Sequence, residues 1–196
     1  MKSFAIALIT LSTFSAFAKD IAADTVLGIV TLGKGFENDT VKVYNADGSL
    51  WVWHSLDGIN HGQGANDFRP YTDYPDYFVL CLRVVSIKGN HYEIIANEET
   101  GLKKYAILDK RSKLTFVGTQ AYLKNNTIGF DWNTNPLRKA IAGAPIDFDR
   151  SLFRTEIITF KGDWAKVKIC DDDKHCVEGW VRWRKGNEMF VKIYKD

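Results

Sequence analysis

The chain has 196 residues, with 26 Lys or Arg against 24 Asp or Glu, so its formal charge is only +2. This near balance argues against nucleic acid as a partner, because nucleic-acid binding requires clustered Lys and Arg. Aromatic residues make up 13% of the chain while proline occurs four times, which is typical of an all-β protein with small aromatic-rich cores.

Residues 1–18 have the pattern of a secretory signal peptide. Lys2 provides a positive start, an apolar stretch follows at residues 4–17, and Ala16-Phe17-Ala18 fits the small-x-small cleavage rule. The alternative is a membrane anchor, but the apolar stretch is shorter than the roughly 20 residues of a span and Ser and Thr interrupt it. We therefore expect a cleaved leader and no membrane span in the mature protein.

Alternation of apolar and polar residues predicts the first strands at residues 25–31, 41–45 and 50–53, with a turn at residues 46–48. Residues 54–76 have no sustained periodicity and contain three glycines and two prolines, so we expect a long loop. Long ordered loops in compact domains are often functional.

Six aromatic residues of this region are candidate ligand-binding residues, because exposed Trp and Tyr side chains favour contacts with sugars, peptides and protein partners. Two interpretations stay open for them. The rings either form an exposed groove or fold back over a small core, and small barrels bury most of their aromatic residues. The candidates are Trp51, Trp53, Phe68, Tyr71, Tyr74 and Tyr77.

A short pattern occurs twice, as VVSIKGN at residues 84–90 and IITFKGD at residues 157–163. Each copy is followed by a large aromatic residue and an alternating run, which predicts a hairpin with a tight turn at Gly89 and at Gly162. The spacing indicates an internal duplication of about seventy residues. We expect an N-terminal module at residues 25–124, containing the loop 54–76, and a C-terminal module at residues 127–196.

The three cysteines are expected in two different states. Cys170 and Cys176 flank a short polar segment at the ends of two strand-like runs, so we predict a disulfide that stabilises the fold by about 2 kcal/mol. Cys81 lies in a continuous apolar stretch, which favours a buried free thiol over pairing between chains.

No constellation in the sequence predicts catalysis, a metal or a cofactor. Cys81 is the one candidate nucleophile outside the predicted disulfide, but it lies within an apolar strand, with His91 across a turn. The acidic run at residues 171–173 indicates a solvated turn, since consecutive acids point in divergent directions and a calcium site needs spaced ligands. His54 and His61 do not fall into a metal-ligand spacing with cysteine.

The string GDWAKVKI followed by GWVRW resembles the bacterial Src-homology-3 (SH3b-type) domain, in which a Gly-Asp-Trp turn opens one strand and Gly-Trp-Val the next. Residues 162–164 and 179–181 hold those places in the C-terminal module. The N-terminal half resembles a diverged copy, with Tyr92 in the place of Trp164 and Gly101 in the place of Gly179. The resemblance implies two small, partly open barrels in tandem, but it carries over no binding residue.

Such domains usually recognise peptidoglycan, peptides or protein partners in exported bacterial proteins, often beside a catalytic domain, and we find no sequence pattern of such a companion here. The first hypothesis is therefore a monomeric, non-enzymatic binding protein of the periplasm or exterior, whose ligand is peptidoglycan or a protein or peptide partner. The alternative is a periplasmic inhibitor or immunity protein that neutralises a toxin or hydrolase.

Overall fold

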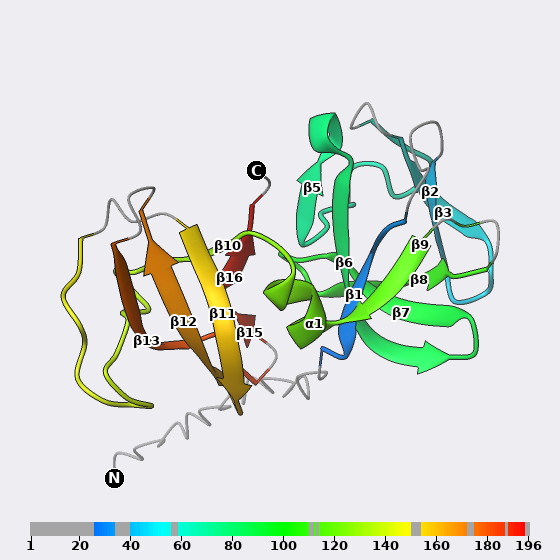
Figure 1. Ribbon diagram of the computed structural model, residues 1–196. Coiled ribbons are helices and arrows are strands. Elements are labelled where there is room, and N and C mark those ends of the chain that lie inside the picture. The colour runs from blue at the N-terminus through cyan, green and yellow to red at the C-terminus, as the bar shows by residue number, and fades with distance from the viewer. Residues whose placement is uncertain are drawn as a thin grey trace, which may run out of the picture.

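The computed structural model describes residues 26–33, 40–55, 59–109, 112, 114–149, 154–171, 175–186 and 188–194. The predicted signal peptide lies outside these residues. In the described part the chain is almost entirely antiparallel β structure, which confirms the predicted all-β class (Figure 1). No helix in this part is long and apolar enough to cross a membrane.

The first sheet contains nine strands in the order β4-β3-β2-β8-β7-β6-β1-β9, with β5 pairing to β6 beside this path. Neither end of the path pairs with the other, so the sheet is open. A short 3-10 helix, η1 (Pro75–Tyr77), links β5 to β6. The strands are β1 (Gly28–Leu32), β2 (Val41–Tyr44), β3 (Leu50–His54), β4 (Asn60–His61), β5 (Thr72–Tyr74), β6 (Val79–Lys88), β7 (His91–Asn97), β8 (Leu102–Ile107) and β9 (Leu114–Gly118).

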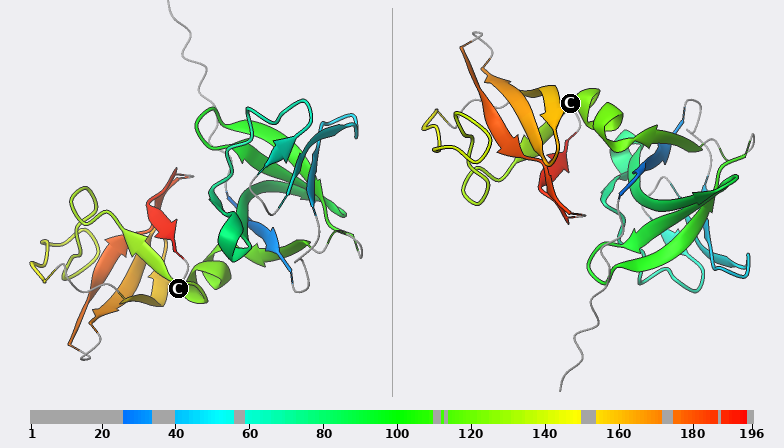
Figure 2. Two further views of the ribbon diagram at one scale, coloured as in Figure 1. Left: turned by 90° about the horizontal axis from the view of Figure 1, so that it is seen from above. Right: turned by 90° about the horizontal axis from the view of Figure 1, so that it is seen from below.

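The second sheet contains five strands in the order β13-β12-β11-β10-β16, and a small ribbon pairs β14 with β15. The helix α1 (Thr119–Lys124) connects the two sheets along the chain, and Figure 2 shows it where they meet. The strands are β10 (Ile128–Phe130), β11 (Arg154–Lys161), β12 (Trp164–Cys170), β13 (Cys176–Arg182), β14 (Arg184–Lys185), β15 (Glu188–Met189) and β16 (Val191–Ile193).

The two predicted hairpins are confirmed. Gly89 (φ +59°) and Gly162 (φ +57°) each occupy the first position of a two-residue turn, where a positive φ favours glycine. The first strand of each hairpin also has a shift in pairing register at the same distance before its turn, near Val85 in β6 and near Ile158 in β11. The duplicated sequence pattern therefore forms the same local structure twice.

Two of the expected correspondences between the halves are wrong. The pairing register places His91, not Tyr92, at the position of Trp164, because each is the first strand residue after its turn. Gly101 lies in the turn between β7 and β8 with φ +70°, whereas Gly179 lies inside β13. At Gly179 a Cβ atom would lie 2.6 Å from Leu137 Cγ, so close packing and not a turn requires this glycine.

The cores explain how the sheets are held together. One cluster lies within the first sheet and is built mainly from valine, isoleucine and leucine of β1 to β8. A second cluster combines Ile29 and Cys81 of the first sheet, Tyr122 and Leu123 of α1, and the buried side chains of the second sheet. The two sheets therefore share apolar packing and do not merely follow one another along the chain.

The structure confirms both expectations about the cysteines. Cys170 and Cys176 form a disulfide across the ends of β12 and β13. Cys81 is a free thiol with no exposed surface, and its Sγ lies 3.1 Å from the Tyr122 hydroxyl in the shared core. Burial raises the pKa of the Cys81 thiol from 9.0 to about 11, so it is protonated and unreactive at neutral pH.

Candidate functional site

Two of the six candidate aromatic residues belong to the core. Trp51 is 5% exposed and Phe68 is 1% exposed, and their rings meet edge to face with centroids 6.3 Å apart. The chain covers Trp51 so closely that a Cβ atom at Gly64 would lie 2.0 Å from its ring. Folding over the core therefore encloses both rings, which favours the core interpretation of the two for Trp51. Phe68 belongs to the same core and also lies at the base of the cleft described below.

The segment 54–76 is not one continuous irregular loop. It contributes the end of β3 and all of β4 and β5, and it packs Phe68 into the first core. Trp53 and Tyr77 are 43% and 55% exposed, and Trp53 lies against the ring of His61. Neither lines the cleft described next, so the six aromatic residues do not form one groove.

Tyr71 and Tyr74 do line a common cleft, which has a volume of about 620 Å³ and lies between the two sheets. One wall comes from the segment around β5 and from the turn between β7 and β8, and the other comes from β16. The lining residues are Asn60, Phe68, Arg69, Pro70, Tyr71, Thr72, Asp73, Tyr74, Glu98, Glu99, Val191, Lys192 and Ile193.

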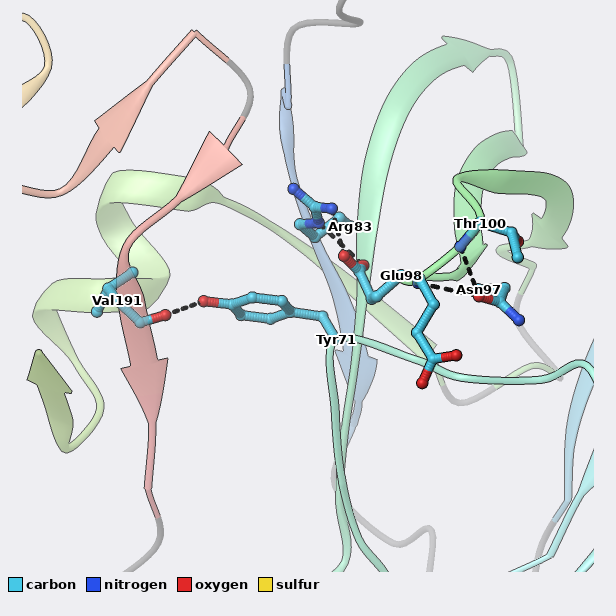
Figure 3. A network of polar contacts seen from close by, with 7 residues as sticks. Tyr71, Arg83, Asn97, Glu98, Thr100 and Val191 are labelled. Atoms are coloured by element: carbon cyan, nitrogen blue, oxygen red, sulfur yellow. Dashed lines mark hydrogen bonds and ion pairs between the residues drawn. The ribbon is translucent and has the colours of Figure 1, made fainter. Parts of the chain in front are cut away.

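Tyr71 joins the two walls. Figure 3 shows its ring extending toward β16, where its hydroxyl donates a hydrogen bond to the backbone carbonyl of Val191. The Arg83 guanidinium lies 5.6 Å from the centroid of the same ring. Burial raises the pKa of Tyr71 far above its ordinary value, so the hydroxyl keeps its proton and remains a donor.

The bond from Tyr71 also covers the edge of the second sheet. β16 pairs only with β10 among the described strands, and an unpaired strand edge is normally a place where another chain can add. Here Val191 and Ile193 are only 2% and 3% exposed, so little of the edge can be reached from solvent. Strand addition is therefore not how this cleft would hold a ligand, and Tyr71 has a structural role.

The turn between β7 and β8, which brings Glu98 and Glu99 to the wall of the cleft, is held by two sets of contacts, both visible in Figure 3. Asn97 Oδ1 accepts hydrogen bonds from the backbone N–H groups of Glu99 and Thr100, each at 2.9 Å, which holds the turn. Arg83 binds the Glu98 carboxylate with two nitrogens, including Nε at 2.9 Å from Oε1, and both side chains are mostly buried. The negative charge of Glu98 is therefore paired with Arg83 within the fold.

A buried histidine lies beside Asp73. His54 is 2% exposed, its Nε2 lies 3.3 Å from Asp73 Oδ1, and its Nδ1 lies 2.8 Å from Asn60 Oδ1. Because both ring nitrogens face groups of the protein, His54 does not itself face a ligand. Across the described residues, no three His, Cys, Asp or Glu side chains gather in a way that could hold a metal ion.

Four residues of the cleft are exposed: Tyr74, which is 38% exposed, and the charged residues Arg69, Glu99 and Lys192. Arg69 is held against its own segment by a hydrogen bond of 2.8 Å that Nη1 donates to the backbone carbonyl of Phe68. Together these residues offer an amphipathic aromatic surface beside one negative and two positive charges. Sequence analysis identified Tyr74 and missed Glu99 and Lys192. Nothing local distinguishes these two from other charged surface residues, since only the meeting of the two sheets brings them together.

No family model, no curated protein and no solved structure matches the chain. The assignment of function therefore depends on the cleft and on the sequence patterns alone.

Proposed function

We propose that the protein is an exported, non-enzymatic binding protein that holds a peptide in the cleft between its two sheets. The observation that carries the proposal is the cleft itself, about 620 Å³ in volume, whose lining includes the exposed residues Tyr74, Glu99 and Lys192. Ligand sites of this size with one aromatic surface and a few fixed polar groups are typical of small-molecule and peptide recognition.

The chemistry of Tyr74, Glu99 and Lys192 defines the kind of peptide. A tyrosine ring contacts apolar side-chain atoms at low cost in side-chain entropy, while its hydroxyl remains hydrated. Glu99 and Lys192 would pair with an amino and a carboxyl group of the ligand, respectively. Both a peptide attached to peptidoglycan and a segment of a protein partner have this chemistry.

Two further observations support export. The leader pattern of residues 1–18 is that of a secreted protein, and the Cys170–Cys176 disulfide is of a kind that persists in oxidising compartments. The proposal of a non-enzymatic role is supported by the state of Cys81, whose thiol is buried and protonated and hence unsuited to nucleophilic attack.

The test is binding of the mature protein to purified sacculi and, separately, to a library of short peptides immobilised on a membrane. We expect retention on one of these, and a loss of about tenfold in affinity for Tyr74→Ala and for Lys192→Gln. Tyr77→Ala is the matched control, since Tyr77 is an exposed tyrosine three residues away and outside the cleft.

The proposal fails if the wild-type protein binds neither sacculi nor peptides. It also fails if binding is unchanged in both cleft variants, because the ligand would then lie elsewhere. Retention on sacculi assigns the ligand to the cell wall, and retention on peptides alone assigns it to a protein partner.

A further inference from the structure

A second hollow lies on the opposite side of the first sheet from its core. Four side chains from four neighbouring strands form a row across it: Tyr44 of β2 is opposite Tyr105 of β8, Tyr105 is opposite Glu93 of β7, and Glu93 is opposite Ser86 of β6. Side chains on directly opposed residues of antiparallel strands lie about 5 Å apart on the same face. The row is therefore continuous.

The burial pattern confirms which face this is. Val43 and Ala106 are the neighbours of Tyr44 and Tyr105 along their strands, and both are completely buried in the first core. Successive residues of a strand point to opposite faces, so the two tyrosines and Glu93 point outward. All three remain partly exposed.

The hollow over this row has a volume of about 330 Å³, which is at the lower end of the ~300–1,000 Å³ range of ligand sites. His91 and Lys88, both exposed, stand at its rim, and their strands pair at this position. None of its lining residues belongs to the cleft between the sheets, so it is an independent site.

The hydrogen-bonding capacity of the polar groups in the hollow is only partly satisfied within the fold. Tyr105 donates a hydrogen bond of 3.5 Å to one Glu93 oxygen, a long contact that leaves the carboxylate with acceptor capacity. Within the described part of the chain, the side chains of Ser86 and His91 have no hydrogen-bond partner. A pair of tyrosines that served only to stabilise the sheet would not need a hollow with spare acceptors and donors beside it.

We propose that this hollow, the Tyr44–Tyr105 groove, binds a sugar ring of a glycan. A pyranose has an apolar C–H face that can lie on the adjacent tyrosine rings, and hydroxyl groups that need both acceptors and donors at its edge. Glu93 supplies the acceptor, and Ser86 and His91 supply groups that can donate. A short neutral or acidic oligosaccharide meets these requirements better than an apolar peptide, since the lining includes the polar side chains of Ser86, Lys88, His91 and Glu93.

The test is a titration of ¹⁵N-labelled protein with chitotetraose and with the disaccharide N-acetylglucosaminyl-N-acetylmuramic acid. We expect saturable chemical-shift changes in β7 and β8 with at least one of them, and a Kd weakened about tenfold by Tyr105→Leu and by Glu93→Gln. Leucine keeps an apolar side chain on the strand, so Tyr105→Leu should fold. Retained dispersion of the variant's spectrum checks this.

Tyr77→Ala is the matched control and should leave glycan affinity unchanged, because Tyr77 is an exposed tyrosine that lines neither the groove nor the cleft. The groove proposal is overturned if neither sugar produces saturable shifts, or if the shifts persist unchanged in both groove variants. Peptide binding in the cleft is measured with other ligands and other variants, so failure of either proposal leaves the other intact.

Discussion

The buried thiol of Cys81 gives the protein a defined loss of stability in alkaline solution. Its pKa is 9.0 for an unperturbed thiol and about 11 in the fold, where burial disfavours the thiolate. Between these values the native state binds the proton and the unfolded state has released it. Stability is therefore fully present below pH 9 and is lost progressively as the pH rises through 11.

The size of this loss follows from the difference between the two pKa values. One pKa unit corresponds to about 1.4 kcal/mol, so the thiol accounts for roughly 2–3 kcal/mol between pH 8 and pH 11. Burial also raises the pKa values of Tyr71 and Tyr122, so these two hydroxyls add to the loss of stability at high pH in the wild-type protein. Cys81→Ser replaces the thiol with a hydroxyl that does not titrate and keeps a polar partner for Tyr122.

The assay is urea unfolding followed by circular dichroism at pH 7, 8, 9, 10 and 11. We expect the free energy of unfolding to fall more steeply with pH in the wild type than in Cys81→Ser, the difference growing by roughly 2–3 kcal/mol. Mass spectrometry should show the Cys170–Cys176 link intact throughout. Two curves that stay parallel between pH 8 and pH 11 would refute the reasoning, because the thiol would then titrate equally in both states.

Three substitutions test the packing and the ion pairs. Gly179→Ala should lower the free energy of unfolding by about 1–3 kcal/mol, since its Cβ would lie 2.6 Å from Leu137 Cγ. Cys176→Ser should lower it by about 2 kcal/mol by removing the disulfide constraint on the unfolded chain. Glu98→Gln should lower it by roughly 1.5–3 kcal/mol, because it leaves the mostly buried Arg83 without its charged partner. Urea unfolding at neutral pH measures all three.

Each substitution has a control within the chain. Gly118→Ala should be nearly neutral, as no atom lies within 4 Å of the added Cβ. Wild-type protein with its disulfide reduced should match Cys176→Ser. Glu178→Gln removes an exposed ion pair with Lys166 and should have little effect. Equal destabilisation by a substitution and its control would contradict the structural reason given for that substitution.

Much of the secondary structure followed from local patterns. The hairpins at Gly89 and Gly162 have alternating strands and a turn dipeptide, and both signals depend only on neighbouring residues. The disulfide was predictable for the same reason, since its two cysteines end adjacent strands of one hairpin. The relation of Gly101 to Gly179 was not, because a glycine in a turn and a glycine in a crowded strand look alike in sequence.

The candidate site was much less accessible to sequence reasoning. Composition identified aromatic residues at 51–77, but their exposure depends on contacts with distant segments that periodicity does not encode. Examples are the bridge between Arg69 and Asn97 and the hydrogen bond from Tyr71 to Val191. Glu99 and Lys192 line one cleft only because the second sheet packs against the first in a shared apolar cluster. The outward row of Tyr44 and Tyr105 likewise depends on the pairing of β2 with β8.

The apolar cluster shared by both sheets has a consequence for how the cleft can select a ligand. Ile29 and Cys81 are completely buried in one cluster with side chains of α1 and of the second sheet, and Tyr71 spans the same junction on the side of the cleft. Moving the walls apart would expose part of that cluster to water, so admitting a bulkier ligand would cost free energy. We therefore expect the cleft to bind thin ligands in preference to bulky ones. Association should be rapid for ligands that fit, since no hinge movement has to close the cleft around them.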